Sequence, residues 1–402
     1  MSVAGVASRK CILVIEPHDS GHHASYLRWI VEGIVERGWV AVLATTVEAL
    51  KNPLLSDLQL NTGQVEIRLM PEHLADGTAA NSIKALLREF RYWRVFRKIV
   101  RRELARQPLA AVIFPYLDYC FVVASILGAP SSNLPWCAIS MRLRVAEGAV
   151  EAGPTPLRWL LARRLLSDVL LRKLFVINPS ILNLPGRWLS SSARNKLGYL
   201  QDPAELRAHC DRIQARATLG IADDVLAVLV FGSIDLRKGI QVLADALVSD
   251  HRLRKYALIV AGRQSVEIRA LIATGTFVLL RTQGRLVILD RLLDDAEQSL
   301  VFSAVDIVWL GYLGHVYMSG VLVLSGQAGL PVVACNAGEI GRLVLDYRLG
   351  SRVDVADPVD VGRGLAELGN EQKRTEIGVR AKQAFASYTP ENLRRNVLDP
   401  LH

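Results

Sequence analysis

The sequence is poor in cysteine and contains no long apolar run. Only five cysteines occur among 402 residues, widely spaced and without a CxxC pair, which excludes a disulfide framework and a cysteine-rich zinc site. No stretch reaches the roughly 18 apolar residues that a membrane-spanning helix needs. A signal peptide is not expected either, because Glu16 interrupts the first apolar run after five residues. These absences predict buried thiols in a reducing compartment and a cytoplasmic location.

Acidic residues are too few to balance the basic ones. The chain has 48 Lys and Arg against 39 Asp and Glu, a formal net charge of +9 at pH 7. This excess favours an anionic partner: a phosphorylated small molecule, nucleic acid or an anionic membrane surface. Apolar residues at 51% and charged residues at 22% are typical of a globular protein. The length fits two domains of ordinary size.

Short apolar runs alternate with helix-length amphipathic segments in both halves of the chain. Near-continuous apolar strands separated by helices predict parallel sheets covered on both faces. We therefore predict an α/β protein with two Rossmann-like, doubly wound domains, residues 1–205 and 206–384. The predicted strands are 11–15, 40–44, 65–70, 110–114, 136–140, 174–177, 225–231, 257–261, 277–280, 305–310 and 331–334.

A glycine-containing turn follows the first predicted strand, where residues 16–23 read EPHDSGHH. Gly21 would let backbone N–H groups at a helix start approach a phosphate. The turn lacks GxGxxG, which disfavours a classical dinucleotide site, and a plain tight turn explains it equally well. The histidines His18, His22 and His23 have no downstream ligand cluster, so no metal site is expected.

The turn after the first strand of the second half carries a basic pair. Residues 231–239 read FGSIDLRKG, and a helical run follows from Ile240. Arg237 and Lys238 just ahead of a helix start make a local anion site, because the ammonium group and the free N–H groups of the helix act together. The alternative is a solvated pair on a loop.

This turn resembles the Gly-Arg-Leu-x-x-x-Lys-Gly signature of the family 4 retaining glycosyltransferases, which have the GT-B fold. The resemblance covers nearly the whole chain and is strongest over residues 225–345. It implies two Rossmann-like domains facing across a cleft, an acceptor domain followed by a nucleotide-sugar donor domain. It also implies that a C-terminal helix, about 385–402, packs back on the first domain. Other matching segments are 21–22, 37–38, 258–262, 289–291, 305–306 and 329–334.

The chain departs from the family pattern at three places. The family arginine falls on Ser233, and the second glycine of the N-terminal Gly-Gly turn is His22. The Glu–seven residues–Glu motif, whose carboxylates contact the donor sugar and the ribose, falls on Val316 and Leu324. His315, with Ser319 and Gly320 at the next helix start, offers substitute polar groups. Ser319 is expected to cap that helix; simple capping, and an ordinary loop histidine at 315, stay open as alternatives.

The resemblance and this chemistry together predict the site residues. Lys238, with Arg237 beside it, would stabilise negative charge on a departing diphosphate. Asp118 and Arg142 follow strands of the first half and are candidates for acceptor contact. The predicted catalytic residues are Lys238, His22 and Asp118, and the predicted donor-binding residues are Gly21, Gly232, Ser233, Arg237, Arg263, Arg291, His315, Ser319 and Gly320.

The predicted function is transfer of a sugar from a nucleotide-diphosphate sugar to a hydroxyl acceptor, with retention of configuration and without a metal or other cofactor. The acceptor is a glycan, a lipid or a small molecule. The missing carboxylates favour an alternative, a non-catalytic sugar-nucleotide-binding or partner subunit, which the retained Lys238 opposes. A third alternative is another GT-B activity, such as sugar-nucleotide epimerisation or carbon–nitrogen coupling. Nucleic acid is not an expected partner, because no recognisable binding module accompanies the charge.

Two basic amphipathic segments lie in the first half. Residues 84–106 hold nine Lys and Arg against two Glu, and residues 158–173 hold five against one Asp. Basic faces beside Trp, Phe and Leu suit an anionic membrane surface, although a solvated helix face would look the same. The membrane interpretation predicts a peripheral location on the inner face of the membrane, with a lipid-linked acceptor or a polysaccharide or oligosaccharide precursor.

Overall fold

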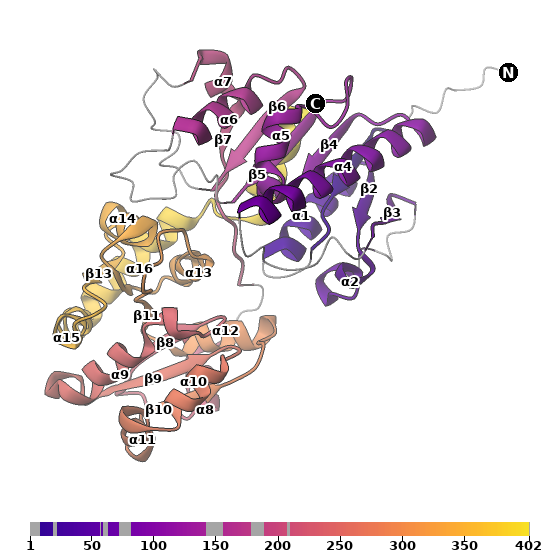
Figure 1. Ribbon diagram of the computed structural model, residues 1–402. Helices are drawn as coiled ribbons and strands as arrows, with labels where there is room; N and C mark the ends of the chain where they lie inside the picture. The colour runs from indigo at the N-terminus through magenta and orange to yellow at the C-terminus, as the bar shows by residue number, and fades with distance from the viewer. Residues whose placement is uncertain are drawn as a thin grey trace. The chain divides into compact units, whose positions relative to one another are not determined.

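A computed structural model describes residues 9–18, 22–56, 58, 63–71, 82–141, 156–177, 189–206 and 210–401. Its contacts divide the chain into two compact units (Figure 1). Unit 1 is Met1–Gln201 together with Pro390–His402, and unit 2 is Asp202–Thr389. Each unit has its own sheet and its own core.

Unit 1 is built on a seven-stranded parallel sheet in the order β3-β2-β1-β4-β5-β6-β7. The central strand β1 pairs with β2 from Cys11 opposite Val40, and with β4 from Ile12 opposite Ala111. The central strands are buried on both faces, as their apolar runs predict. The strands are β1 (Cys11–Ile15), β2 (Val40–Thr45), β3 (Val65–Leu69), β4 (Ala111–Phe114), β5 (Trp136–Ser140), β6 (Leu171–Val176) and β7 (Leu197–Tyr199).

Helices cover both faces of this sheet. One face packs against α4 (Ser82–Arg106), α5 (Phe121–Leu127), α6 (Pro156–Leu166) and α7 (Ser191–Lys196). The other packs against α1 (His22–Glu36), α2 (Val47–Leu50), α3 (Pro53–Ser56) and the C-terminal α17 (Pro390–Leu398). Helix α17 packs on α1 although the two are far apart in the sequence. Just beyond the ends of these helices, the Arg37 guanidinium lies 2.9 Å from the Asp399 carboxylate.

Unit 2 is built on a six-stranded parallel sheet in the order β10-β9-β8-β11-β12-β13. Helices α9, α10, α11 and α15 cover one face, and α8, α12, α13, α14 and α16 cover the other. The strands are β8 (Leu226–Phe231), β9 (Tyr256–Ala261), β10 (Leu286–Leu289), β11 (Ile307–Leu310), β12 (Val332–Cys335) and β13 (Gly350–Val353). The helices are α8 (Arg212–Leu219), α9 (Ile240–Ser249), α10 (Val266–Ile272), α11 (Gly275–Thr282), α12 (Asp295–Ala304), α13 (Gly320–Ala328), α14 (Gly338–Tyr347), α15 (Pro358–Glu367) and α16 (Glu371–Phe385).

The strand order of each sheet reverses at one point. The reversal lies between β1 and β4 in unit 1, and between β8 and β11 in unit 2. In doubly wound sheets, ligands bind outside the carboxyl ends of the strands at this topological switch point. The topology therefore directs attention to the residues that follow β1, β4, β8 and β11.

One predicted strand is wrong. Residues 277–280 lie within α11, and the strand of this region is β10. Phe277 and Leu280 are fully buried while Val278 and Leu279 are exposed, which is helical spacing that a four-residue apolar run does not reveal. The basic segment 158–173 is likewise not one helix, because α6 ends at Leu166 and β6 begins at Leu171.

No helix in the described part of the chain combines the length and the apolar composition that a bilayer span needs.

Candidate functional site

The first candidate site lies at the switch point of unit 2, where two glycines make the turns after β8 and β9. Gly232 has a φ of +95° and Gly262 a φ of +133°, conformations that residues with a side chain rarely adopt. A Cβ on Gly262 would also overlap the carbonyl oxygen of Gly232. The loop after β8 therefore begins in close contact with the loop after β9. Lys238 lies near the same point, since a Cβ built on Gly232 would be 3.9 Å from its Nζ.

Lys238 reaches this point because of the local turn chemistry. The Asp235 carboxylate accepts the N–H of Arg237 at 3.0 Å and starts a 3-10 turn over Leu236–Lys238. Gly239 then adopts a φ of +59° and leads into α9, and a Cβ there would overlap the carbonyl oxygen of Gly311 just after β11. The turn thus packs directly on the end of β11.

The ammonium group of Lys238 is held by neutral groups. Its Nζ donates to the carbonyl oxygen of Phe231 at 3.0 Å and to the hydroxyl of Tyr312 at 2.6 Å. The backbone is also fixed, since Trp309 Nε1 donates to the carbonyl oxygen of Lys238 at 2.7 Å. Neither of the two oxygens that Nζ contacts carries a charge, so the positive charge of Lys238 stays available to an anion.

The loop after β11 brings two predicted residues to Lys238. The Tyr312 hydroxyl lies 3.3 Å from Ser319 Oγ, and the Tyr312 ring lies 5.3 Å from the His315 ring. Burial lowers the pKa of His315; a hydrogen bond to the Met318 carbonyl opposes this, and the charges of Arg237 and Lys238 add to it. The His315 imidazole is therefore neutral near neutral pH, a hydrogen-bonding group rather than a second cation.

One expectation about this loop needs correction. Ser319 stands at the N-cap position of α13, but its hydroxyl makes no capping hydrogen bond and contacts Tyr312 instead. Arg237 lies on the same turn as Lys238, and its exposed guanidinium binds the Asp235 carboxylate at 2.7 and 3.0 Å.

The remaining predicted donor residues lie on neighbouring loops. Ser233 and Arg263 are exposed on the loops after β8 and β9. Arg291 follows β10, and its Nε lies 2.9 Å from the Glu297 carboxylate. Gly320 is the first residue of α13, directly after Ser319. The contacts thus bring Gly232, Lys238, His315 and Ser319 into one group, with Gly320 adjoining it.

Val316 and Leu324 cannot replace the carboxylates of the family motif. Val316 is exposed and Leu324 is buried in the core. Glu339 at the start of α14 comes close to this segment through its backbone, whose N–H donates to the Val316 carbonyl oxygen at 3.1 Å. The Glu339 side chain is buried and paired with Arg342 at 2.5 and 3.0 Å. Sequence reasoning missed this residue, although Gly338-Glu339 directly follows a predicted strand.

The second candidate site lies at the switch point of unit 1. Glu16 follows β1 and is fully buried, and its Oε1 accepts the N–H of His18 at 3.0 Å. Its Oε2 lies 3.3 Å from His23 Nδ1, an ion-pair distance whose angle does not make a hydrogen bond. His23 Nε2 lies 2.8 Å from the hydroxyl of Tyr119, which follows β4. A carboxylate, an imidazole and a phenol are therefore in series.

Aromatic rings surround this series. Tyr119 lies 4.4 Å from the His18 ring and 4.7 Å from the Tyr116 ring, and His23 lies 4.3 Å from Tyr116. Burial and the charge of Glu16 raise the pKa of Tyr119, so the phenol stays protonated. In the tautomer that carries its proton on Nδ1, His23 accepts from this phenol at Nε2 and turns the Nδ1 proton toward Glu16.

Asp118 is the one residue predicted for this region whose side chain the structure describes. Asp118 is buried, and its two oxygens accept from the hydroxyl of Ser140 and the N–H of Met141, both at 2.8 Å. It therefore ties the ends of β4 and β5 together. Gly21 and Arg142 lie outside the described residues, and His22 is the first residue of α1. The imidazole beside Tyr119 is that of His23, which the sequence analysis did not select; the signal that could have indicated it is the glutamate directly after the first strand.

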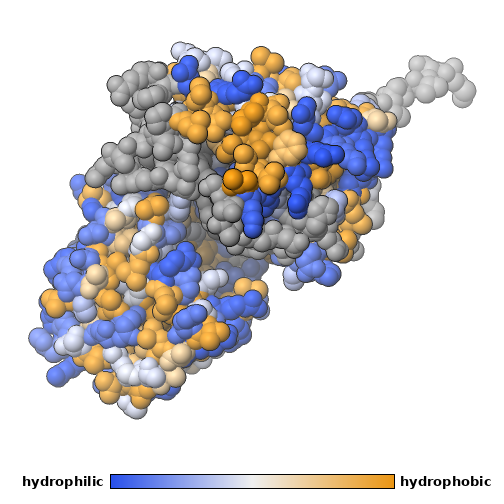
Figure 2. Space-filling model, in the orientation of Figure 1, coloured by the Kyte–Doolittle hydropathy of each residue, from blue (hydrophilic) through white to orange (hydrophobic). Residues whose placement is uncertain are grey.

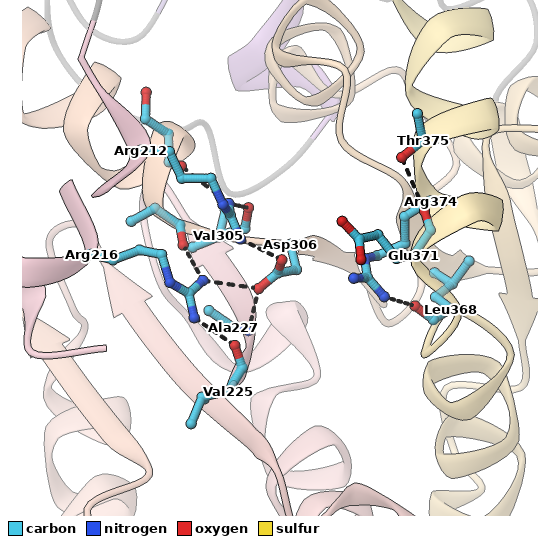
Figure 3. A network of polar contacts seen from close by, with 12 residues as sticks. Arg212, Arg216, Val225, Ala227, Val305, Asp306, Leu368, Glu371, Arg374 and Thr375 are labelled. Atoms are coloured by element: carbon cyan, nitrogen blue, oxygen red, sulfur yellow. Dashed lines mark hydrogen bonds and ion pairs between the residues drawn. The ribbon is translucent and has the colours of Figure 1, made fainter. Parts of the chain in front are cut away.

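A cavity of about 460 Å³ lies at the amino ends of β8, β11 and β12 in unit 2. Arg212 and Arg216 on α8 bind the Asp306 carboxylate there at 2.6 and 3.2 Å, and Asp306 also accepts the N–H of Ala227 at 2.8 Å (Figure 3). These contacts fasten α8 to β8 and β11. Because ligands of doubly wound sheets bind at the carboxyl ends of the strands, we assign this network a structural role. Among the described residues, no cluster of His, Cys, Asp and Glu could hold a metal ion.

Solved structures resemble this chain over its whole length. No family model and no curated protein sequence matches it. Sucrose-phosphate synthase from Thermosynechococcus elongatus superposes with a TM-score of 0.68, 17% identity, and coverage of 96% of this chain and 97% of that one. HepE from Anabaena, in complex with UDP and glucose, superposes with a TM-score of 0.65 and 14% identity, and the match covers 98% of this chain and 99% of that one. WaaG, a glycosyltransferase involved in lipopolysaccharide biosynthesis, superposes with a TM-score of 0.63 and 15% identity, and the match covers 96% of this chain and 99% of that one. At this identity the likeness shows the fold, which is that of the GT-B glycosyltransferases.

Proposed function

We propose that the chain transfers a sugar from a nucleotide-diphosphate sugar to a hydroxyl acceptor. The observation that carries the proposal is Lys238, an ammonium group held by neutral partners at the switch point of unit 2 in a GT-B fold. Departure of the nucleotide diphosphate builds negative charge on its oxygens. A fixed cation stabilises that charge more in the transition state than in the bound substrate, and this difference accelerates the reaction.

The donor diphosphate is proposed to lie between Lys238, the Gly232 turn and the start of α13. Because the Ser319 hydroxyl does not cap α13, N–H groups of its first turn are free of that side chain and add partial positive charge. His315 adds a neutral hydrogen-bonding group. The structural neighbour HepE was solved with UDP and with UDP-glucose, which supports a nucleotide sugar as ligand of this fold.

The acceptor hydroxyl is proposed to bind at the switch point of unit 1, beside Tyr119 and His23. The buried Glu16 lies beside the imidazole, and the imidazole holds the Tyr119 hydroxyl, so the phenol oxygen offers an acceptor hydroxyl a hydrogen-bonding group in a fixed position. The resemblance to retaining transferases implies front-face attack, in which the acceptor proton passes to the departing phosphate oxygen. On this mechanism Tyr119 and His23 orient the hydroxyl and form no covalent bond to the sugar.

No metal is part of the proposed mechanism, because Lys238 supplies the positive charge at the diphosphate. The acceptor is proposed to be a glycan, a lipid or a small molecule, with a lipid-linked or membrane-bound precursor favoured by the basic residues of unit 1. Chelation with EDTA is expected to leave transfer unchanged; loss of transfer on chelation, with recovery on adding a divalent cation, would contradict this part.

A thermal-shift panel of UDP-, GDP-, ADP- and dTDP-sugars tests the donor proposal. A ligand that binds only the folded chain raises the melting temperature by mass action, by an amount that grows with its concentration. The sugar nucleotide that gives the largest shift is then tested for hydrolysis and transfer. If no member of the panel shifts the melting temperature and none is hydrolysed, the proposal fails.

One observation favours a second candidate function. Val316 and Leu324 occupy the positions where the family has carboxylates that contact the donor, so a sugar-nucleotide-binding subunit without catalysis is the alternative. The two functions differ in one measurement. A non-catalytic subunit binds a member of the panel but neither hydrolyses nor transfers its sugar, whereas an enzyme hydrolyses it slowly even without an acceptor.

A further inference from the structure

Helices α4, α5 and α6 form one layer on the outside of unit 1. The Glu89 carboxylate on α4 accepts the N–H groups of Val122 and Val123, in the first turn of α5, at 2.9 and 3.2 Å. The Arg164 guanidinium on α6 donates to the Ile126 carbonyl oxygen, near the end of α5, at 3.2 and 3.4 Å. A negative group at the start of α5 and a positive group at its end match the helix dipole. The three helices are therefore fastened side by side, and we call them the α4–α6 layer.

The α4–α6 layer exposes large apolar side chains. Ile83 and Leu87 on α4 are 74% and 63% exposed, and Leu160 on α6 is 61% exposed. Figure 2 shows an orange area over α5 and the adjoining part of α4, with blue over the rest of α4. Single exposed leucines are ordinary, but a group of them on adjacent helices marks an interaction surface. The exposed apolar residues of the layer are Ile83, Leu86, Leu87, Phe90, Ile126, Leu127, Leu157 and Leu160.

The exposed charges of this layer are all positive. Both acidic residues of α4 are buried: Glu89 binds the start of α5, and Glu103 is held by Arg68 and Arg106 at 2.8 and 2.7 Å. Helices α5 and α6 contain no acidic residue. The exposed basic residues of the layer are Lys84, Arg91, Arg94, Lys98, Arg101, Arg102, Arg106, Arg163 and Arg164.

We propose that the α4–α6 layer docks on an anionic lipid bilayer and inserts its apolar side chains at the boundary between headgroups and acyl chains. The basic side chains then lie at headgroup phosphates. A second copy of the chain is a poor occupant, because two surfaces of the same sign repel one another. Nucleic acid does not match the apolar centre. This inference goes beyond electrostatic attraction, since insertion predicts binding that partly survives high salt.

Co-sedimentation with vesicles tests the proposal on the full chain, without donor or acceptor. Vesicles of equal parts phosphatidylcholine and phosphatidylglycerol are compared with pure phosphatidylcholine, at low salt and at about 1 M salt, where the Debye length is about 3 Å. We expect binding to the anionic vesicles at low salt, with a measurable fraction retained at high salt. Because no sugar is present, this result is independent of the proposed transferase activity.

Two sets of substitutions separate insertion from charge. The triple variant Leu87→Ser, Phe90→Ser and Leu160→Ser should bind anionic vesicles roughly tenfold or more weakly at both salt concentrations, because burial of three large side chains is lost. The triple variant Arg94→Glu, Lys98→Glu and Arg101→Glu should lose binding at low salt. The matched control is Val266→Ser, Leu292→Ser and Val359→Ser in unit 2, whose side chains are at least as exposed and should not affect binding.

The depth to which the α4–α6 layer enters the bilayer is measured with a tryptophan probe. Leu87→Trp should gain emission that brominated phospholipids quench, while Leu292→Trp should gain emission that they do not. Insertion is contradicted if the serine variant binds like the wild type, or if Leu87→Trp is not quenched. Docking on lipid is contradicted if the wild type stays in the supernatant at low salt. Self-association that is lost in the serine variant, without vesicle binding, would instead identify the layer as an interface between copies.

Discussion

The ammonium nitrogen of Lys238 lies 2.6 Å from the hydroxyl oxygen of Tyr312. This contact joins the loop after β8 to the loop after β11, the two strands between which the sheet of unit 2 reverses. The Tyr312 hydroxyl also reaches Ser319 Oγ at the start of α13. Phosphate oxygens are stronger acceptors for an ammonium group than a phenol or a carbonyl, so a bound diphosphate is expected to displace these neutral partners.

Replacing Lys238 should therefore remove transition-state stabilisation. We expect Lys238→Ala to lower kcat by a factor on the order of 100 to 1000, about 3–4 kcal/mol, the usual loss when a group that stabilises developing negative charge is removed. Steady-state transfer assays measure this, and melting curves check that the variant folds. Arg237→Ala is the matched control and should cost much less, because Arg237 is bound to Asp235. Unchanged turnover in Lys238→Ala would rule out the assigned role.

Removing single polar atoms beside the acceptor should separate transfer from donor chemistry. Tyr119→Phe and His23→Gln are each expected to raise the KM for the acceptor up to about tenfold, since one hydrogen bond contributes about 0.5–1.5 kcal/mol. Donor hydrolysis without acceptor should be unchanged. Tyr347→Phe, on an exposed tyrosine of unit 2, is the control. Parallel loss of donor hydrolysis in the Tyr119 and His23 variants would show that these residues serve the donor instead.

The lowered pKa of His315 predicts a dependence of stability on pH. Below the ordinary histidine pKa of about 6.5 the unfolded chain binds a proton that the folded chain does not bind until the lower folded pKa is reached. The contribution of His315 is thus fully retained above that ordinary value and lost as the pH falls through the window between the two pKa values. Denaturant unfolding of His315→Gln between about pH 5 and pH 8 should show a smaller loss of stability on acidification than the wild type. His251→Gln, on an exposed histidine, is the control; equal slopes in His315→Gln and wild type would contradict the assignment.

Two glycines with similar backbone angles should respond differently to alanine. Gly239 and Gly275 have φ values of +59° and +53°, so both substitutions carry the strain of a left-handed residue, about 1 kcal/mol. A Cβ on Gly239 also overlaps the Gly311 carbonyl oxygen, whereas nothing lies within 4 Å of one on Gly275. Gly239→Ala should therefore destabilise unit 2 by roughly 3 kcal/mol, measured by urea unfolding. Equal losses in the two variants would mean that the contact with Gly311 is absent.

Breaking the network around Asp306 should be costly. Asp306→Ala would leave the buried Arg216 without its carboxylate partner, and losing one member of a buried pair costs about 3–5 kcal/mol. Asp224→Ala, which removes only an exposed pairing with Lys255, should leave the unfolding midpoint unchanged. A small effect of Asp306→Ala would indicate that water replaces the carboxylate in the cavity.

Most strands, and the turn that carries Lys238, were readable from the sequence because their signals are local. The predicted strands 11–15 and 136–140 coincide with β1 and β5, since a buried parallel strand needs a continuous apolar run. Lys238 was recognised from its own neighbours, a turn with glycines at 232 and 239 ahead of a helix. Residues 277–280 misled because four apolar residues fit a buried strand and one side of a helix equally well.

Which residues meet was decided only by the tertiary structure. Tyr312 stands 74 residues after Lys238, and Tyr119 stands 96 residues after His23. These pairs form because β11 is placed beside β8 and β4 beside β1. In the same way, the packing of α5 between α4 and α6 joined two separate basic segments into one surface. Apolar periodicity reports that a side chain is buried, but strand order and helix packing choose its partner, because that choice depends on contacts between segments far apart in the chain.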